Sequence, residues 1–136
     1  MKTEEISINH YSFNRIRRKQ YRLNPNEIVL FEELCVRQEE SLKIGQKEFP
    51  YSMSNMEEDT NIKRRTLETI VSKFTSIGFL SHETKPNKFS RTFVKYYRVD
   101  FSVLAQKEIL SQFINENSCY FKNMLSYFKK IAKLQY

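Results

Sequence analysis

Glycine and proline are scarce in this sequence, with two glycines and three prolines in 136 residues. This scarcity leaves little room for flexible linkers or for a glycine-rich phosphate-binding loop. No apolar run is long enough to cross a bilayer. The N-terminus begins Met-Lys-Thr-Glu-Glu and lacks the apolar core of a secretion signal. We therefore expect a cytoplasmic protein without a membrane partner.

Cysteine and histidine are equally rare. Cys35 and Cys119 are the only cysteines, and each has apolar neighbours typical of a helix. We interpret both as small buried hydrophobic residues in a reducing compartment, not as a disulfide or a catalytic thiol. His10 and His82 lack the spacing of metal ligands, and no nucleophile elbow or P-loop motif is present. The sequence therefore predicts no metal, no cofactor and no enzymatic activity.

Positive charge is in excess. Lysine and arginine number 23 against 16 acidic residues, which gives a net charge of +7 and a pI of about 9.4. This balance favours a polyanionic partner, either nucleic acid or an anionic membrane surface. Hydrophobic residues make up 40% of the chain and aromatic residues 14%, which indicates a folded protein. The length suits one domain with a proper core.

The first helix signal is Asn24-Pro25-Asn26-Glu27, with Asn24 as the N-cap and Pro25 at the first helical position. We expect this helix to end near Ser41 and to be followed by a loop. Residues 48–51 are expected to form a short strand that pairs with a later hairpin.

A short helix and a tight turn are predicted next. Ser52 or Ser54 caps this helix, and the acidic run Glu57-Glu58-Asp59 favours its positive end. Asn61 tolerates the left-handed conformation that a tight turn requires. Ile62 is expected to pack beneath that turn.

A second helix is predicted over residues 63–77. Its apolar residues recur in steps of three and four and so form one stripe. They are Leu67, Ile70, Val71, Phe74 and Ile77. Gly78 then ends the helix, because glycine adopts positive φ at little cost. Residues 79–99 predict a β-hairpin with its turn at Lys85-Pro86-Asn87-Lys88.

This pattern resembles the winged helix-turn-helix domains of bacterial and plasmid replication initiators, phage replisome organisers and related regulators. The matching residues cover roughly half of the chain and are Phe49-Pro50-Tyr51-Ser52, Met56, Asn61-Ile62, Lys63-Arg64-Arg65-Thr66 and Ile77-Gly78-Phe79-Leu80. One departure is Asn61, where such turns commonly have glycine, although asparagine can adopt the same backbone shape. The resemblance implies a mainly helical fold with a small β-hairpin wing. It also implies replication initiation or transcription regulation, often on plasmids, phages or other mobile elements.

The basic residues cluster where a winged helix meets double-stranded DNA. The resemblance implies that the start of the recognition helix, residues 63–77, would reach base edges in the major groove and that the wing, residues 79–99, would neutralise phosphates. The candidate DNA-binding residues are Lys63, Arg64, Arg65, Thr66, Thr69, Lys73, Lys85, Lys88 and Arg91, with Lys95 and Arg98 also on the wing. Alternation along the second strand does not decide which face points to solvent. The competing interpretation is a basic helix and hairpin without a ligand.

Two segments flank this central domain, which we place at residues 24–100. The N-terminal one, residues 1–23, is either an arm that contacts DNA or a solvated basic face. Its candidate contacts are Arg15, Arg17, Arg18 and Lys19. The C-terminal one, residues 101–136, predicts two helices, over about 103–115 with Ser102 as cap and over about 119–134.

The C-terminal helices have three competing interpretations. They pack on the domain, form a homodimer interface, or lie on a membrane as a basic amphipathic element. Packing or dimerisation is the expectation. The alternative to DNA binding is a protein–protein interaction module that uses the winged-helix scaffold and these helices as its docking surface.

Overall fold

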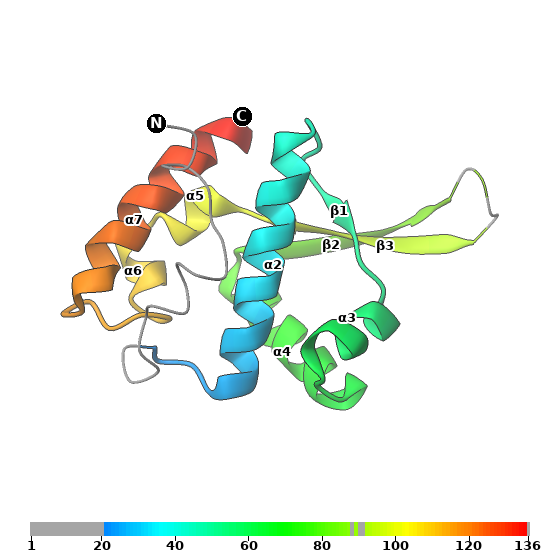
Figure 1. Ribbon diagram of the computed structural model, residues 1–136, viewed down its shortest axis with the longest axis horizontal. Coiled ribbons are helices and arrows are strands. Elements are labelled where there is room, and N and C mark those ends of the chain that lie inside the picture. Colours follow the sequence, from blue (N-terminus) through cyan, green and yellow to red (C-terminus); the bar gives the residue numbers. More distant parts are fainter. Residues whose placement is uncertain (1–20, 88, 90–91, 136) are drawn as a thin grey trace.

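The computed structural model of the chain describes residues 21–87, 89 and 92–135. This part is mainly helical with a small three-stranded antiparallel sheet (Figure 1), which confirms the predicted fold class. The elements are α2 (Pro25–Lys43), β1 (Phe49–Pro50), α3 (Met53–Thr60), α4 (Arg64–Ile77), β2 (Leu80–Pro86), β3 (Phe93–Val99), α5 (Phe101–Leu104), α6 (Lys107–Leu110), α7 (Cys119–Ala132) and the 3-10 turn η3 (Lys133–Gln135). The predicted contacts Arg15, Arg17, Arg18, Lys19, Lys88 and Arg91 lie outside the described residues.

Helix α2 begins where the sequence predicts it. The Asn24 side chain accepts a hydrogen bond from the Glu27 N–H at 2.9 Å, and the Glu27 carboxylate accepts one from the Asn24 N–H at 3.1 Å. This capping box satisfies two backbone donors that the first helical turn leaves unpaired. The helix extends to Lys43 and lies between α7 on one side and the α3–α4 pair on the other (Figure 1).

Helices α3 and α4 are joined by the predicted tight turn. Ser52 caps α3 by accepting from the Asn55 N–H at 3.0 Å. Asn61 adopts φ 58° and ψ 33°, and Ile62 is buried beneath the turn. Gly78 ends α4 with φ 107°. These four local predictions are confirmed.

The predicted role of the acidic run Glu57-Glu58-Asp59 is wrong. Helix α3 begins at Met53, so these residues lie in its second half, away from the positive end. Asp59 instead accepts from the Tyr51 hydroxyl at 2.8 Å and from the Arg37 guanidinium at 2.6 Å. The same guanidinium lies 3.9 Å from the centre of the Tyr51 ring. Since Arg37 belongs to α2, this cluster holds α3 against α2.

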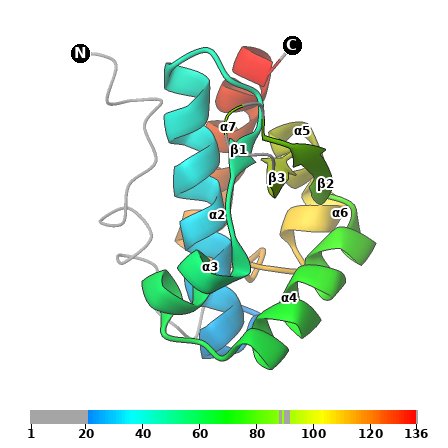
Figure 2. The ribbon, with the colours of Figure 1, turned by 90° about the vertical axis from the view of Figure 1, so that its right-hand side faces the viewer.

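The sheet has the order β1-β3-β2. Strand β1 pairs with β3 through Phe49 and Tyr97, as predicted for residues 48–51. Strands β2 and β3 pair from Leu80–Val99 out to Pro86–Phe93, and this hairpin projects away from the helices (Figures 1 and 2).

The register also decides which residues share each face of the hairpin. Partners in an antiparallel pair lie on the same face, so Leu80, His82, Tyr97 and Val99 form one face with Lys95. That face enters the core at its root, where Tyr97 is fully buried.

The predicted helix over residues 103–115 is wrong. That segment contains two one-turn helices, α5 and α6, and Asp100 caps the first of them instead of Ser102. Leu104 and Phe113, nine residues apart within the predicted helix, are both fully buried. Nine residues make about two and a half helical turns, so one straight helix would point these side chains in opposite directions. The break lets both reach the core.

Helix α7 matches its prediction, and its apolar face packs within the chain. Its buried residues are Phe121, Met124, Phe128, Ile131 and Ala132. The Phe128 ring stacks on Phe101 with centroids 5.6 Å apart. Of the three interpretations of this helix, the described residues therefore favour packing on the domain. None of the described helices has the length and apolarity needed to span a membrane.

One aromatic cluster joins the central and C-terminal segments. The Phe113 ring stacks on Phe31 of α2 at 5.1 Å and meets Phe79 edge-on at 5.2 Å. The C-terminal segment therefore contributes to the same core as the helix-turn-helix. Cys35 is buried in that core as predicted, whereas Cys119 is exposed at the start of α7, which corrects the prediction that it is buried.

Candidate nucleic-acid interface

The face of α4 opposite its apolar stripe is uncovered along its whole length. Leu67 and Phe74 are fully buried. Arg65, Thr69, Ser72 and Ser76 are exposed and recur in steps of four, three and four, so they form one ridge. We call these four residues the outer ridge. It is a continuous polar surface that ends, at its N-terminal side, in an arginine.

Three cations gather at the positive end of α4, as the sequence predicts. Lys63, Arg64 and Arg65 are all exposed, and the Lys63 side chain makes no capping hydrogen bond. The Arg64 N–H donates to the Glu57 carboxylate at 3.0 Å, and the Arg64 Nε lies 4.0 Å from the same group. Arg64 is therefore partly neutralised, whereas Lys63 and Arg65 have no ion-pair partner in the described part of the chain. The helix dipole adds positive potential at this end.

Two predicted site residues lie on a different side of α4. The Lys73 ammonium donates to the Glu27 carboxylate of α2 at 2.8 Å, and the Glu27 side chain is only 10% exposed. Thr66, which is only partly exposed, lines a hollow beside Asn24 and Glu27. Lys73 and Thr66 therefore face the start of α2, and Thr69 of the outer ridge borders the same hollow.

The hairpin cations divide between its two faces. Lys85 forms an ion pair with Glu48 and lies 5.3 Å from the centre of the Tyr96 ring, on the face away from α4. Lys95 lies on the opposite face with His82. Among the described residues, Lys95 has no carboxylate partner. The predicted contact Lys85 is therefore partly neutralised, while Lys95 retains its charge.

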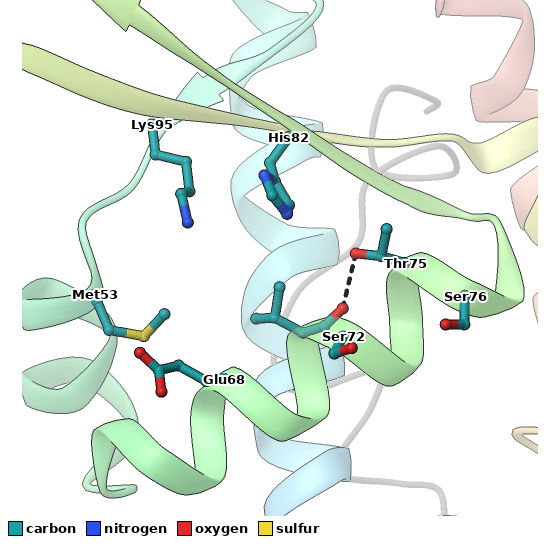
Figure 3. A pocket seen from close by; sticks show the side chains of 8 residues that line it. Met53, Glu68, Ser72, Thr75, Ser76, His82 and Lys95 are labelled. Carbon is teal, nitrogen blue, oxygen red and sulfur yellow. Dashed lines mark hydrogen bonds between the residues drawn. The ribbon is translucent and has the colours of Figure 1, made fainter.

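A cleft of about 350 Å³ lies between α4 and the hairpin. It is lined by Met53, Glu68, Val71, Ser72, Thr75, Ser76, His82 and Lys95. Figure 3 shows His82 and Lys95 pointing from the hairpin toward α4, with Glu68 beside Met53 at the α3 end. The Thr75 hydroxyl donates to the Val71 carbonyl at 2.8 Å. The hydroxyls of Ser72 and Ser76 make no hydrogen bond with the described residues.

His82 is the titratable side chain whose pKa is shifted in this cleft. Burial, and then the charge of Lys95, lower the pKa of His82 from its ordinary value of 6.5. Both effects disfavour the protonated ring. An anion that entered the cleft would act in the opposite direction.

Sequence reasoning missed Ser72, Ser76 and His82 as site residues. The outer ridge was detectable in the spacing of the polar residues of α4, because they lie opposite the apolar stripe. The position of His82 depends on the β2–β3 register, which the sequence alone left open. The described residues contain no group of three or more His, Cys, Asp or Glu side chains arranged to hold a metal ion.

Comparison of the chain with protein-family models, with curated proteins and with solved structures finds no match.

Proposed function

We propose that this chain is a winged helix-turn-helix protein that binds double-stranded DNA in a sequence-dependent manner. Helix α4 would lie in the major groove, and the β2–β3 hairpin would act as the wing on the sugar–phosphate backbone. The observation that carries the proposal is the outer ridge of α4. It is uncovered in the described structure, lies opposite a buried stripe, and begins at three exposed cations.

The chemistry of the ridge suits base recognition. An arginine can donate two parallel hydrogen bonds to guanine, and serine and threonine hydroxyls can donate to or accept from base edges and phosphates. Arg65 and Thr69 occupy the N-terminal half of α4, the part that enters deepest in helix-turn-helix complexes. Lys63 at the positive end of the helix is suited to a phosphate. The net charge of +7 supports attraction to a polyanion.

The predicted DNA-contact residues differ in whether a carboxylate of the protein already pairs with them. Lys73 and Lys85 each have a carboxylate partner, so DNA would have to compete with Glu27 or Glu48 for them. The Lys85–Glu48 pair lies at the surface, where an ion pair is worth about 0–1 kcal/mol, so DNA can compete for Lys85. Glu27 is mostly buried and would lose its partner, so Lys73 is harder to recruit. We therefore assign the larger roles to Arg65, Lys63 and Lys95.

The sequence resemblance to the winged helix-turn-helix domains of replication initiators and related regulators leads us to propose a role in replication initiation or transcription regulation. A homodimer through the C-terminal helices has less support, because the apolar face of α7 is buried within the chain. The alternative, a protein-interaction module that docks through the C-terminal helices, has less support for the same reason, because the apolar face of α7 is already buried within the chain. Any dimer would use other parts of the surface.

Selection of bound sequences from a random duplex pool at physiological salt tests the proposal. Enrichment of a shared sequence is expected, and a palindrome would indicate a dimer and give its half-site spacing. The same chain should bind the selected duplex less tightly as salt rises, with a slope of about −0.9 per phosphate contact.

The decisive variant is Arg65→Ala, with Lys129→Ala as the matched control. Lys129 is an exposed cation of α7, a helix that lies on the other side of α2 from α4 (Figure 1). Arg65→Ala should lose roughly 1–3 kcal/mol of discrimination at one base pair of the selected site. Lys129→Ala should keep the preference and change affinity only slightly. Identical behaviour of the two variants would count against α4 as the recognition helix.

A further inference from the structure

The cleft between α4 and the hairpin brings together groups that bind anions. Lys95 of β3 and His82 of β2 point into it from one side, and Ser72 and Ser76 of α4 line the other (Figure 3). These residues come from three separate elements. Among the described residues, Glu68 is the only carboxylate that lines the cleft.

We propose that this cleft binds a phosphate group of the DNA backbone, with Lys95 and His82 contacting it from the hairpin and the hydroxyls of Ser72 and Ser76 contacting it from α4. The inference rests on the proposed function. If α4 occupies the major groove while the hairpin contacts the flanking backbone, one strand must pass between these two elements. The cleft is the space between them, and its volume of about 350 Å³ is ample for a phosphodiester.

Lys95 differs from Lys73 and Lys85 in having no ion-pair partner in the described part of the chain. Lys73 is paired with Glu27 and Lys85 with Glu48. Lys95 has no carboxylate partner among the described residues, so no internal contact has to be broken before it binds an anion. Its contact with a phosphate would release counterions and would add to the salt dependence of binding.

His82 couples the cleft to pH. The charged groups that line the cleft with His82 are Lys95 on β3 and, at the end beside Met53, Glu68 on α4, and the Tyr97 ring lies 5.5 Å from the His82 ring (Figure 3). Burial and Lys95 lower the pKa of His82 from 6.5, so the ring is mainly neutral at pH 7 in the free protein. A phosphate beside the ring would favour its protonated form and raise its pKa.

The direction of the pH effect follows from that difference. Because the pKa of His82 would be higher in the complex than in the free protein, binding takes up a proton. The affinity for DNA should therefore rise as pH falls through the pKa of the bound state, and should level off below the pKa of the free state. One proton gives at most about a tenfold change in affinity per pH unit.

A histidine titration followed by NMR measures this coupling directly. In a His10→Gln background, His82 is the only histidine of the chain, so its ring signals need no further assignment. The pKa of His82 should rise when a short duplex of mixed sequence is added. An unchanged or lower pKa in the complex would overturn the inference.

Fluorescence anisotropy with the same duplex gives a second readout. Between about pH 8 and pH 5.5, which spans the ordinary histidine pKa, the parent should gain affinity several-fold and His82→Gln should gain little. Lys95→Met should make the salt slope shallower by about one unit, while Lys129→Met should leave it unchanged. All of these side chains lie at the surface, and thermal unfolding checks that each variant is folded.

Glu68→Gln provides a test in which binding improves. Removing the Glu68 charge from the cleft should tighten DNA binding, because the carboxylate repels a phosphate there. Glu83→Gln is the matched control, since Glu83 is an exposed carboxylate on the opposite face of the same hairpin. The improvement should be clearly larger for Glu68→Gln.

The outcomes separate this inference from the proposed function. Parent protein that binds duplex DNA with a steep salt dependence, while the His82, Lys95 and Glu68 variants all match it, would overturn the cleft and leave the function standing. Parent protein that binds no duplex at low salt would overturn both.

Discussion

Replacing Gln135 by alanine should destabilise the whole domain, although this residue belongs to η3 and not to α4 or the hairpin. Gln135 is only 2% exposed. Its Oε1 accepts from the Phe101 N–H at 2.8 Å, and its Nε2 donates to the Val99 carbonyl at 2.8 Å. Gln38 of α2 accepts from the Val99 N–H at 2.7 Å. The side chains of Gln38 and Gln135 therefore provide the hydrogen-bond partners of the backbone groups at the junction of β3 and α5.

The magnitude follows from the groups that the substitution leaves without partners. Val99 and Phe101 are both fully buried, so Gln135→Ala leaves one N–H and one carbonyl unpaired. Each costs roughly 1–3 kcal/mol, which gives about 2–6 kcal/mol in total. We expect about 3 kcal/mol, because the space left by the side chain admits water. Typical domains have about 5–15 kcal/mol of stability, so this loss is a large share.

Urea unfolding monitored by circular dichroism measures the loss. With an m value of about 2 kcal/mol per molar, a loss of 3 kcal/mol lowers the midpoint by about 1.5 M. Gln46→Ala is the matched control, because Gln46 is exposed, and it should change stability by less than about 0.5 kcal/mol. An equally small effect of Gln135→Ala, or an early transition confined to the C-terminal segment, would refute the argument that this segment is part of one cooperative core.

Gln135→Glu should be worse than alanine at neutral pH. A buried carboxylate can accept from Phe101 but cannot donate to the Val99 carbonyl, and burial raises its pKa. Stability should recover as pH falls through that raised pKa, because the protonated carboxyl group regains a donor.

Two further substitutions test other parts of the fold. The Tyr97 hydroxyl is buried and has no hydrogen-bond partner among the described residues, and burial raises the pKa of Tyr97 to about 12. Tyr97→Phe should therefore leave the free energy of unfolding in urea unchanged or raise it by up to about 1 kcal/mol. A loss of more than about 1 kcal/mol would mean that the hydroxyl has a hydrogen-bond partner after all. Gly78 has φ 107°, and a side chain placed there would meet open space. Gly78→Ala should therefore lower the free energy of unfolding by roughly 1–2 kcal/mol through backbone strain alone, and Gly78→Asn should lower it less. Equal losses for the two variants would contradict this explanation.

Much of the fold was predictable because its signals are local. The capping box at Asn24, the left-handed turn at Asn61 and the end of α4 at Gly78 each involve residues within one helical turn of one another. The apolar stripe of α4 likewise depends only on a period of 3.6 residues. Local signals of this kind do not depend on what the segment packs against, so they hold before the tertiary structure is known.

The C-terminal segment shows where such reasoning fails. The sequence has apolar residues at helical spacing after Asp100, and most of them are buried as expected. The segment nevertheless forms α5 and α6 instead of one helix, because Leu104 and Phe113, which a straight helix would point in opposite directions, are both buried in one core. Similarly, Cys119 has apolar neighbours, but the packing of α7 leaves it exposed.

The sequence by itself determined that an amphipathic helix with a basic start follows a tight turn and precedes a hairpin. Only the tertiary structure decided which of its cations remain available. Lys73 pairs with Glu27 across 46 positions of the chain, and Lys85 pairs with Glu48 across 37. Lys95 and His82 meet Ser72 and Ser76 only once β2 and β3 have paired in register. The residues that form an ion pair or line one cleft are far apart in the sequence and come together only on folding. A local sequence pattern therefore does not reveal them.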